Sequence, residues 1–202
     1  MGFNYLIFML LICSTITNGQ KMKTFKITEG VKASLPADFL SMSDDDLAVK
    51  YPSTKKPLAM FTNLDRIADF GLNVNKSSWP GNDLKILQGV YKSTIMDMYN
   101  KVEFLQEGIK TINKKEFIIF EFISVFEGQR NYTFLQYAVV KNQVYLFNFS
   151  TAAHLKDKWQ PIAQKIMSSI KMSVKDRIEV KPIVKDGVKK YVPKKVPMKP
   201  AK

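Results

Sequence analysis

The fold is decided by the stretch FIIFEFISVF, residues 117–126, in which apolar side chains occupy almost every position. A strand that is covered on one face alternates apolar and polar residues, whereas a strand that is covered on both faces has apolar residues at both odd and even positions. Residues 117–126 therefore predict a central strand of a sheet that carries a packing layer on each side.

Three further strands accompany this one along the chain. Short polar turns lead from it into an alternating strand at 132–140 and then into an aromatic strand at 144–149. Turns this short join antiparallel neighbours. Upstream, residues 102–112 predict another strand, in which Gly108 favours a bulge or a close approach of a second backbone.

Two segments carry the apolar period of an amphipathic helix. The first covers residues 84–98 and has Asn82 or Asp83 as its natural N-cap. The second covers residues 156–171, where Pro161 is compatible only with the first turn. Helices that return onto an antiparallel sheet covered on both faces imply a single α/β/α sandwich, which is an α/β (α+β) fold class.

The first part of the domain is predicted to consist of short strands and turns. Asp44-Asp45-Asp46, next to serines, favours a capped turn over a calcium site, because the alternating ligands, glycine and terminal glutamate of an EF-hand loop are missing. Short strands are predicted at 24–28, 32–39, 47–51, 58–62 and 66–74.

Several short motifs occur in a characteristic order over roughly residues 30–172. They are Leu35-Pro36, Ala59-Met60-Phe61-Thr62-Asn63, the turn from Ile112 to Phe117, the aromatic hairpin Phe134…Phe149, and Trp159 followed by Ile166-Met167-Ser168-Ser169-Ile170. This order resembles the PsbP/Mog1-like proteins, which include bacterial exported members of unknown role. The resemblance implies one α/β/α domain that acts by binding or assembly. Extrinsic photosystem proteins and a Ran-binding protein share this scaffold while binding unrelated partners, so the resemblance carries no partner over to this chain.

The net charge of +13 is concentrated at one end of the chain. Residues 21–172 carry 21 basic and 15 acidic side chains, whereas residues 173–202 carry 10 basic and 3 acidic ones. A nucleic-acid-binding domain would need a concentrated basic face on its folded part, so no nucleic-acid partner is expected. A hydrophobic fraction of 46% excludes a wholly disordered chain.

The N-terminus has the features of an export signal. Residues 3–12 form an uncharged apolar run that is too short for a transmembrane span, and small polar residues follow it. We expect residues 1–19 to be a signal peptide that is cleaved before Gln20, leaving a mature chain without a transmembrane span. Lipidation at Cys13 and an uncleaved anchor are the two alternatives.

Few residues could perform catalysis. His154 is the only histidine and would have to act with Asp157 and a distant serine. The carboxylate pairs are Glu116 with Glu121, and Asp65 with Asp69. One histidine and one cysteine cannot build a zinc site of the usual kind, so we expect no metal and no cofactor.

Residues 173–202 combine prolines with lysines and predict a flexible, extended tail. Such a tail either serves as a solvated charged terminus or tethers the protein electrostatically to an anionic surface. The lysines available for a tether are Lys189, Lys190, Lys194, Lys195 and Lys199.

Together these features predict a single domain at 20–172 in an exported, monomeric protein. We expect a non-enzymatic binding or assembly protein in the periplasm or outside the cell, with an unknown protein or an anionic envelope surface as its partner. The alternative is a small extracytoplasmic hydrolase that uses His154 or a carboxylate pair.

Overall fold

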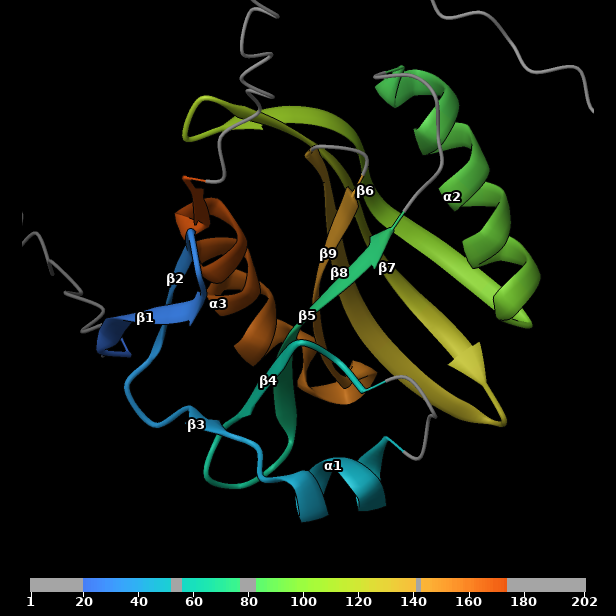
Figure 1. The fold of residues 1–202 in the computed structure, drawn as a ribbon. Coiled ribbons are helices and arrows are strands. Elements are labelled where there is room, and N and C mark those ends of the chain that lie inside the picture. Colours follow the sequence, from blue (N-terminus) through green and yellow to red (C-terminus); the bar gives the residue numbers. More distant parts are fainter. Residues whose placement is uncertain (1–19, 52–55, 77–82, 141–142, 174–202) are drawn as a thin grey trace, which may run out of the picture.

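The structure, a computed structural model, describes residues 20–51, 56–76, 83–140 and 143–173 (Figure 1). The decisive stretch lies in β7, an interior strand of a seven-stranded sheet in which every pair of neighbours is antiparallel. In spatial order the strands are β3 (Leu40–Ser41), β4 (Ala59–Thr62), β5 (Ala68–Lys76), β9 (Gln143–Ala152), β8 (Gln129–Val140), β7 (Lys115–Phe126) and β6 (Lys101–Ile112).

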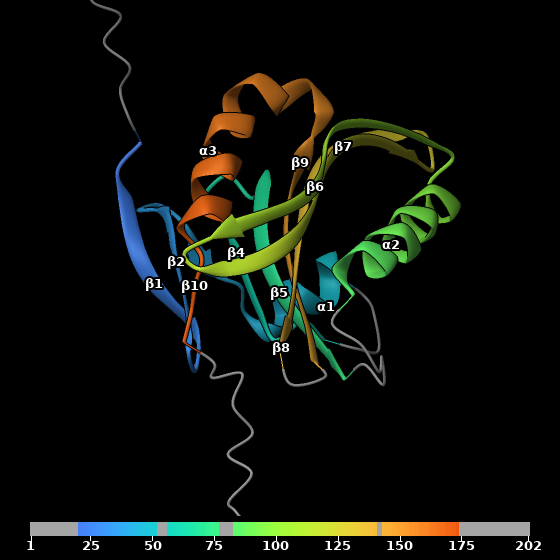
Figure 2. The same ribbon diagram turned by 90° about the horizontal axis from the view of Figure 1, so that it is seen from above.

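The sheet is covered on both faces, as the apolar character of β7 predicts. Phe117 and Ile119 point into the core beneath α3 (Lys156–Ser169), whereas Ile118 and Phe120 point into a second core beneath α2 (Leu84–Met98). Figures 1 and 2 show α2 on one side of the large sheet and α3 on the other. This arrangement confirms the predicted α/β/α sandwich.

Both helices form close to their predicted positions. The side chain of Asp83 caps α2 by accepting hydrogen bonds from the backbone N–H groups of Lys85 and Ile86, at 3.0 and 3.2 Å. A 3-10 turn, η1 (Ala153–Leu155), precedes α3. Pro161 lies inside α3 beyond the first turn, so its predicted confinement to that turn is wrong. None of the helices in the described ranges combines the length and the apolar character that a membrane crossing requires.

A second, smaller sheet packs beside α3. It consists of β1 (Met22–Thr28), β2 (Val31–Pro36) and β10 (Lys171–Met172), with β2 in the middle. Lys171 therefore begins a strand, although the sequence predicts it as the last residue of the helix. The backbone N–H of Ser34 donates to Ser169 Oγ at 2.8 Å, which ties β2 to the end of α3.

The predicted strand at 47–51 is wrong, because these residues lie in and directly after a helix, α1 (Asp44–Lys50). Ser43 is its N-cap. Ser43 Oγ accepts a hydrogen bond from the backbone N–H of Asp46, and Asp46 Oδ2 accepts one from the backbone N–H of Ser43. This reciprocal capping box and the acidic first turn favour the helix over an extended strand.

Gly108 has a different role from the predicted one. The register of β6 against β7 shifts between Phe104 and Gln106, so the irregularity lies at Leu105. A Cβ atom at Gly108 would meet nothing within 4 Å, which excludes a close approach of another backbone. Gly108 instead has a φ of +145°, a conformation that residues with a side chain rarely adopt.

Candidate functional site

The residues predicted for catalysis are not brought together. His154 is exposed in η1, at the junction between the large sheet and α3. Asp157 is exposed as well and lies 3.2 Å from the ammonium group of Lys156. No described serine is hydrogen-bonded to His154, so the geometry of a Ser-His-Asp triad is not present in the described part of the chain.

The proposed carboxylate pairs do not form either. Glu116 and Asp65 are exposed, whereas Glu121 and Asp69 are buried. Glu121 points toward α3, and Glu116, at the opposite parity of β7, points to the other face of the sheet. Asp65 lies in the exposed turn before β5, whereas Asp69 is buried and paired with Lys50. Carboxyl groups on opposite faces of a sheet cannot act on one bond, and a carboxylate that is buried in an ion pair is not free to act with an exposed one, so neither predicted pair has geometric support for acid-base catalysis.

Glu121 holds α3 against the sheet. Its carboxylate accepts hydrogen bonds from the hydroxyl of Tyr132 at 2.8 Å, from Gln160 at 2.6 Å and from Gln164 at 3.3 Å. Burial, and then the neighbouring carboxylate, raise the pKa of Tyr132 above its ordinary value, so the phenol stays neutral and continues to donate. This network is structural, since it connects two packed elements and its two members on the sheet, Glu121 and Tyr132, are buried.

The predicted signal peptide at 1–19 with Cys13 lies outside the described residues. The lysines proposed for the tether, Lys189, Lys190, Lys194, Lys195 and Lys199, lie outside them as well. These predictions remain as the sequence states them.

A groove that the sequence did not predict lies on the α2 face of the sheet, between the end of α2 and α1, and has a volume of about 450 Å³. We call it the polar groove. Its floor consists of five polar side chains from four strands: Asp69, Ser124, Asn131, Thr133 and Ser150.

The strand register explains why these side chains meet. Asp69 on β5 lies opposite Ser150 on β9, which lies opposite Thr133 on β8. Asn131 on β8 lies opposite Ser124 on β7. Side chains that are directly opposite each other on antiparallel strands share one face of the sheet, so the five form a continuous polar floor.

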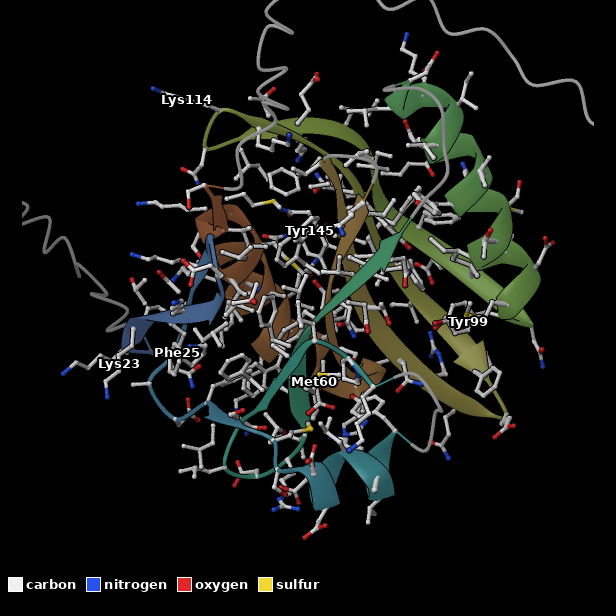
Figure 3. All side chains as sticks on the ribbon, viewed as in Figure 1. Lys23, Phe25, Met60, Tyr99, Lys114 and Tyr145 are labelled. Atoms are coloured by element: carbon white, nitrogen blue, oxygen red, sulfur yellow. The ribbon has the colours of Figure 1, made fainter. Side chains whose placement is uncertain are left out.

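The rim of the polar groove consists of Lys50 and Tyr51 on one side and Tyr99 and Phe126 on the other. Lys50 and Tyr51 lie at the end of α1, and Tyr99 follows the last residue of α2. Figure 3 shows Tyr99 beside the end of α2, next to the sheet. The rings of Tyr99 and Phe126 meet edge to face, with centroids 6.2 Å apart.

The charges in the polar groove compensate one another. Asp69 is only 3% exposed, and its carboxylate lies 2.7 Å from the ammonium group of Lys50 and accepts a hydrogen bond from the Tyr51 hydroxyl at 2.6 Å. Arg66, beside the groove, lies 2.6 Å from a carboxylate oxygen of Asp46. Each described cation at the groove therefore has its own carboxylate partner, and the groove is close to neutral.

The Tyr51 phenol is fixed as a hydrogen-bond donor. Burial raises its pKa above the ordinary value, and the Asp69 carboxylate raises it further. Ser124 Oγ, in contrast, is buried and has no hydrogen-bond partner among the described residues. A buried hydroxyl without a partner costs free energy, which a polar group bound in the groove would recover.

A second cavity, of about 530 Å³, lies between α3 and strands β6 to β8. Its walls include Lys110 and Lys165, whose long side chains can rotate into the space. The polar groove has a floor of short polar side chains on hydrogen-bonded strands, and Asp69 holds Lys50 at its rim, so it is the better-organised site. Three or more His, Cys, Asp or Glu side chains do not gather as a possible metal site anywhere in the described ranges.

No protein-family model matches the sequence, and no curated protein matches it either. Among solved structures, the cyanobacterial PsbP protein CyanoP from Synechocystis has a TM-score of 0.56 at 13% identity, over 81% of this chain and 98% of that one. LpqN of Mycobacterium tuberculosis, involved in cell envelope biogenesis, has a TM-score of 0.54 at 10% identity, over 75% of this chain and 90% of that one. This chain therefore has the PsbP/Mog1-like fold that its order of elements predicts.

Proposed function

We propose that this chain is an exported, non-enzymatic binding protein of a bacterial envelope and that the polar groove is its ligand-binding site. The observation that carries the proposal is the organisation of the groove, in which the buried carboxylate of Asp69 is held by both Lys50 and Tyr51. A carboxylate and an amine that are bound to each other are poorly placed to move protons, but they form a rigid polar surface.

Two further observations support an envelope role. The sequence begins with an apolar segment that resembles an export signal, and LpqN, which shares the fold, is described as involved in cell envelope biogenesis. The basic tail adds a means of attachment, because each lysine near an anionic membrane contributes about 1 kcal/mol of binding free energy. The tail lysines would thus hold the domain close to the surface where its ligand lies.

The proposal is tested by co-sedimentation of the purified full-length mature protein with bacterial envelope fragments. Phe126→Ala truncates a groove side chain that is 46% exposed. Ile86→Ala is the matched control, because Ile86 is 52% exposed and lies at the start of α2, whereas the groove lies beside the end of that helix. A third variant replaces the five tail lysines named above with glutamine.

We expect the Phe126 variant to sediment less than the wild type at every salt concentration, and the Ile86 variant to behave as the wild type. The tail variant should lose the part of the binding that salt weakens. If neither the groove variant nor the tail variant changes the amount that sediments, the proposed function is wrong.

A further inference from the structure

We propose that the polar groove binds a neutral sugar unit of a glycan; this inference rests on the proposed function and specifies its ligand class. A sugar ring presents hydroxyl groups around its edge and C–H groups on its faces. A site that recognises it needs polar side chains for the edge and an aromatic surface for a face.

The aromatic surface is present on one side of the groove. Phe126 is 46% exposed, and Tyr99 packs against both Phe126 and Phe122, with ring centroids 6.2 and 5.8 Å apart. Phe122 is fully buried, so it anchors the Tyr99 ring from below. Aromatic faces carry a negative quadrupole that attracts weakly positive C–H groups, which suits the apolar face of a sugar.

The polar side chains have the right chemistry for hydroxyl groups. Ser124, Thr133 and Ser150 present hydroxyls, and Asn131 presents an amide, so each of the four can both donate and accept. Sugar hydroxyls also donate and accept. Ser124 Oγ lacks a partner among the described residues and is therefore available for such a bond.

The charge of the groove favours a neutral ligand over an anion. A phosphate or carboxylate ligand is bound most strongly by cations that are free to contact it. The ammonium group of Lys50 is engaged by Asp69 and by the carbonyl oxygen of Arg66, at 2.7 and 3.0 Å, and the Arg66 guanidinium contacts Asp46. An anion would have to displace one of these partners and would meet the buried Asp69 carboxylate.

The size of the groove agrees with this ligand class. Its volume of about 450 Å³ falls within the range of about 300–1,000 Å³ that is typical of small-ligand sites. It also opens to solvent, since Phe126 and Lys50 are exposed. One sugar unit can therefore occupy the groove while the rest of a glycan chain extends outside.

Calorimetric titration of the full-length mature protein tests the inference. The probes are the neutral disaccharides cellobiose, lactose, maltose and chitobiose at concentrations up to tens of millimolar, with inorganic phosphate and glucuronate as anionic probes. The variants are Phe126→Ala and Thr133→Val, which retains the shape of threonine but removes its hydroxyl. Ile86→Ala is the control, and circular dichroism verifies that each variant is folded.

We expect at least one neutral disaccharide to bind, with a dissociation constant that rises about tenfold in each groove variant and is unchanged in the Ile86 variant. If only phosphate or glucuronate binds and the groove variants weaken that binding, the sugar inference is wrong while the proposed function stands. If no probe binds, the sugar inference is also wrong, and the co-sedimentation experiment then decides the proposed function separately.

Discussion

The ion pair between Lys50 and Asp69 should be an energetically coupled part of the polar groove, and a double-mutant cycle can measure this coupling. Lys50→Met removes the ammonium group while keeping the aliphatic stem and the helix propensity of α1. Asp69→Asn removes the negative charge while keeping an oxygen that can accept from the Tyr51 hydroxyl. The pair connects α1 to β5, because the two charged groups lie 2.7 Å apart.

The expected magnitude follows from the burial of the two partners. Asp69 is 3% exposed, whereas the Lys50 side chain is 38% exposed. Exposed pairs contribute about 0–1 kcal/mol, and removing one partner of a fully buried pair costs about 3–5 kcal/mol. We therefore expect Lys50→Met to lower the free energy of unfolding by about 2 kcal/mol, and the coupling energy to be about 1–2 kcal/mol.

Urea denaturation of the wild type, the two single variants and the double variant, followed by circular dichroism, yields the coupling energy. Lys85→Met, at an exposed lysine of α2, is the control and should change stability by less than about 0.5 kcal/mol. A coupling energy below about 0.5 kcal/mol would refute the claim that this ion pair organises the groove.

Three further predictions concern α1, β6 and the buried tyrosines. Ser43→Ala removes the capping box and should lower the free energy of unfolding by about 1 kcal/mol in urea denaturation, whereas an unchanged midpoint would contradict this role. Gly108→Ala forces a side chain onto a φ of +145° and should cost about 1–3 kcal/mol; a neutral result would show that β6 relaxes without cost. The pKa values of Tyr51 and Tyr132 are raised in the folded state, so their contribution to stability is complete below pH 10 and is lost as the pH rises above that value. Tyr51→Phe should reduce the loss of stability above pH 10 by up to about 1.4 kcal/mol per pH unit, and an unchanged alkaline slope would exclude Tyr51 as a cause.

The elements that the sequence predicts well are those with long periodic patterns. Residues 117–126 are apolar at both parities, and the structure covers both faces of β7. The segments that became α2 and α3 carry apolar stripes over several turns, which leaves little room for another interpretation. The small sheet was harder to predict, because β10 is only two residues long and its pairing with β2 depends on how the chain returns.

The error at α1 has a local physical reason. Leu47, Val49 and Tyr51 alternate with less apolar residues, which is the pattern of a strand, and seven residues are too few to establish a helical period. The capping signal Ser43-Asp44-Asp45-Asp46 was present in the sequence and favours a helix start. Capping therefore determined the structure of a segment whose periodicity is ambiguous.

The polar groove could not be predicted as a site, because its floor residues come from four separate strands. Ser124, Thr133 and Ser150 are ordinary strand residues when each is considered alone. Only the strand register places them side by side. A weak signal did exist, since these polar residues interrupt otherwise apolar strands and fall toward the same end of the sheet.

Nuclear magnetic resonance titration of the isotope-labelled full-length mature protein tests the central claim most directly. The titrant is the neutral disaccharide that binds most tightly in calorimetry. Our account predicts that the backbone amide shifts concentrate at Ser124, Thr133 and Ser150 and saturate with one dissociation constant. Shifts that are absent from the groove, or that concentrate instead at Gln136 on β8 and Gln164 on α3, would contradict it.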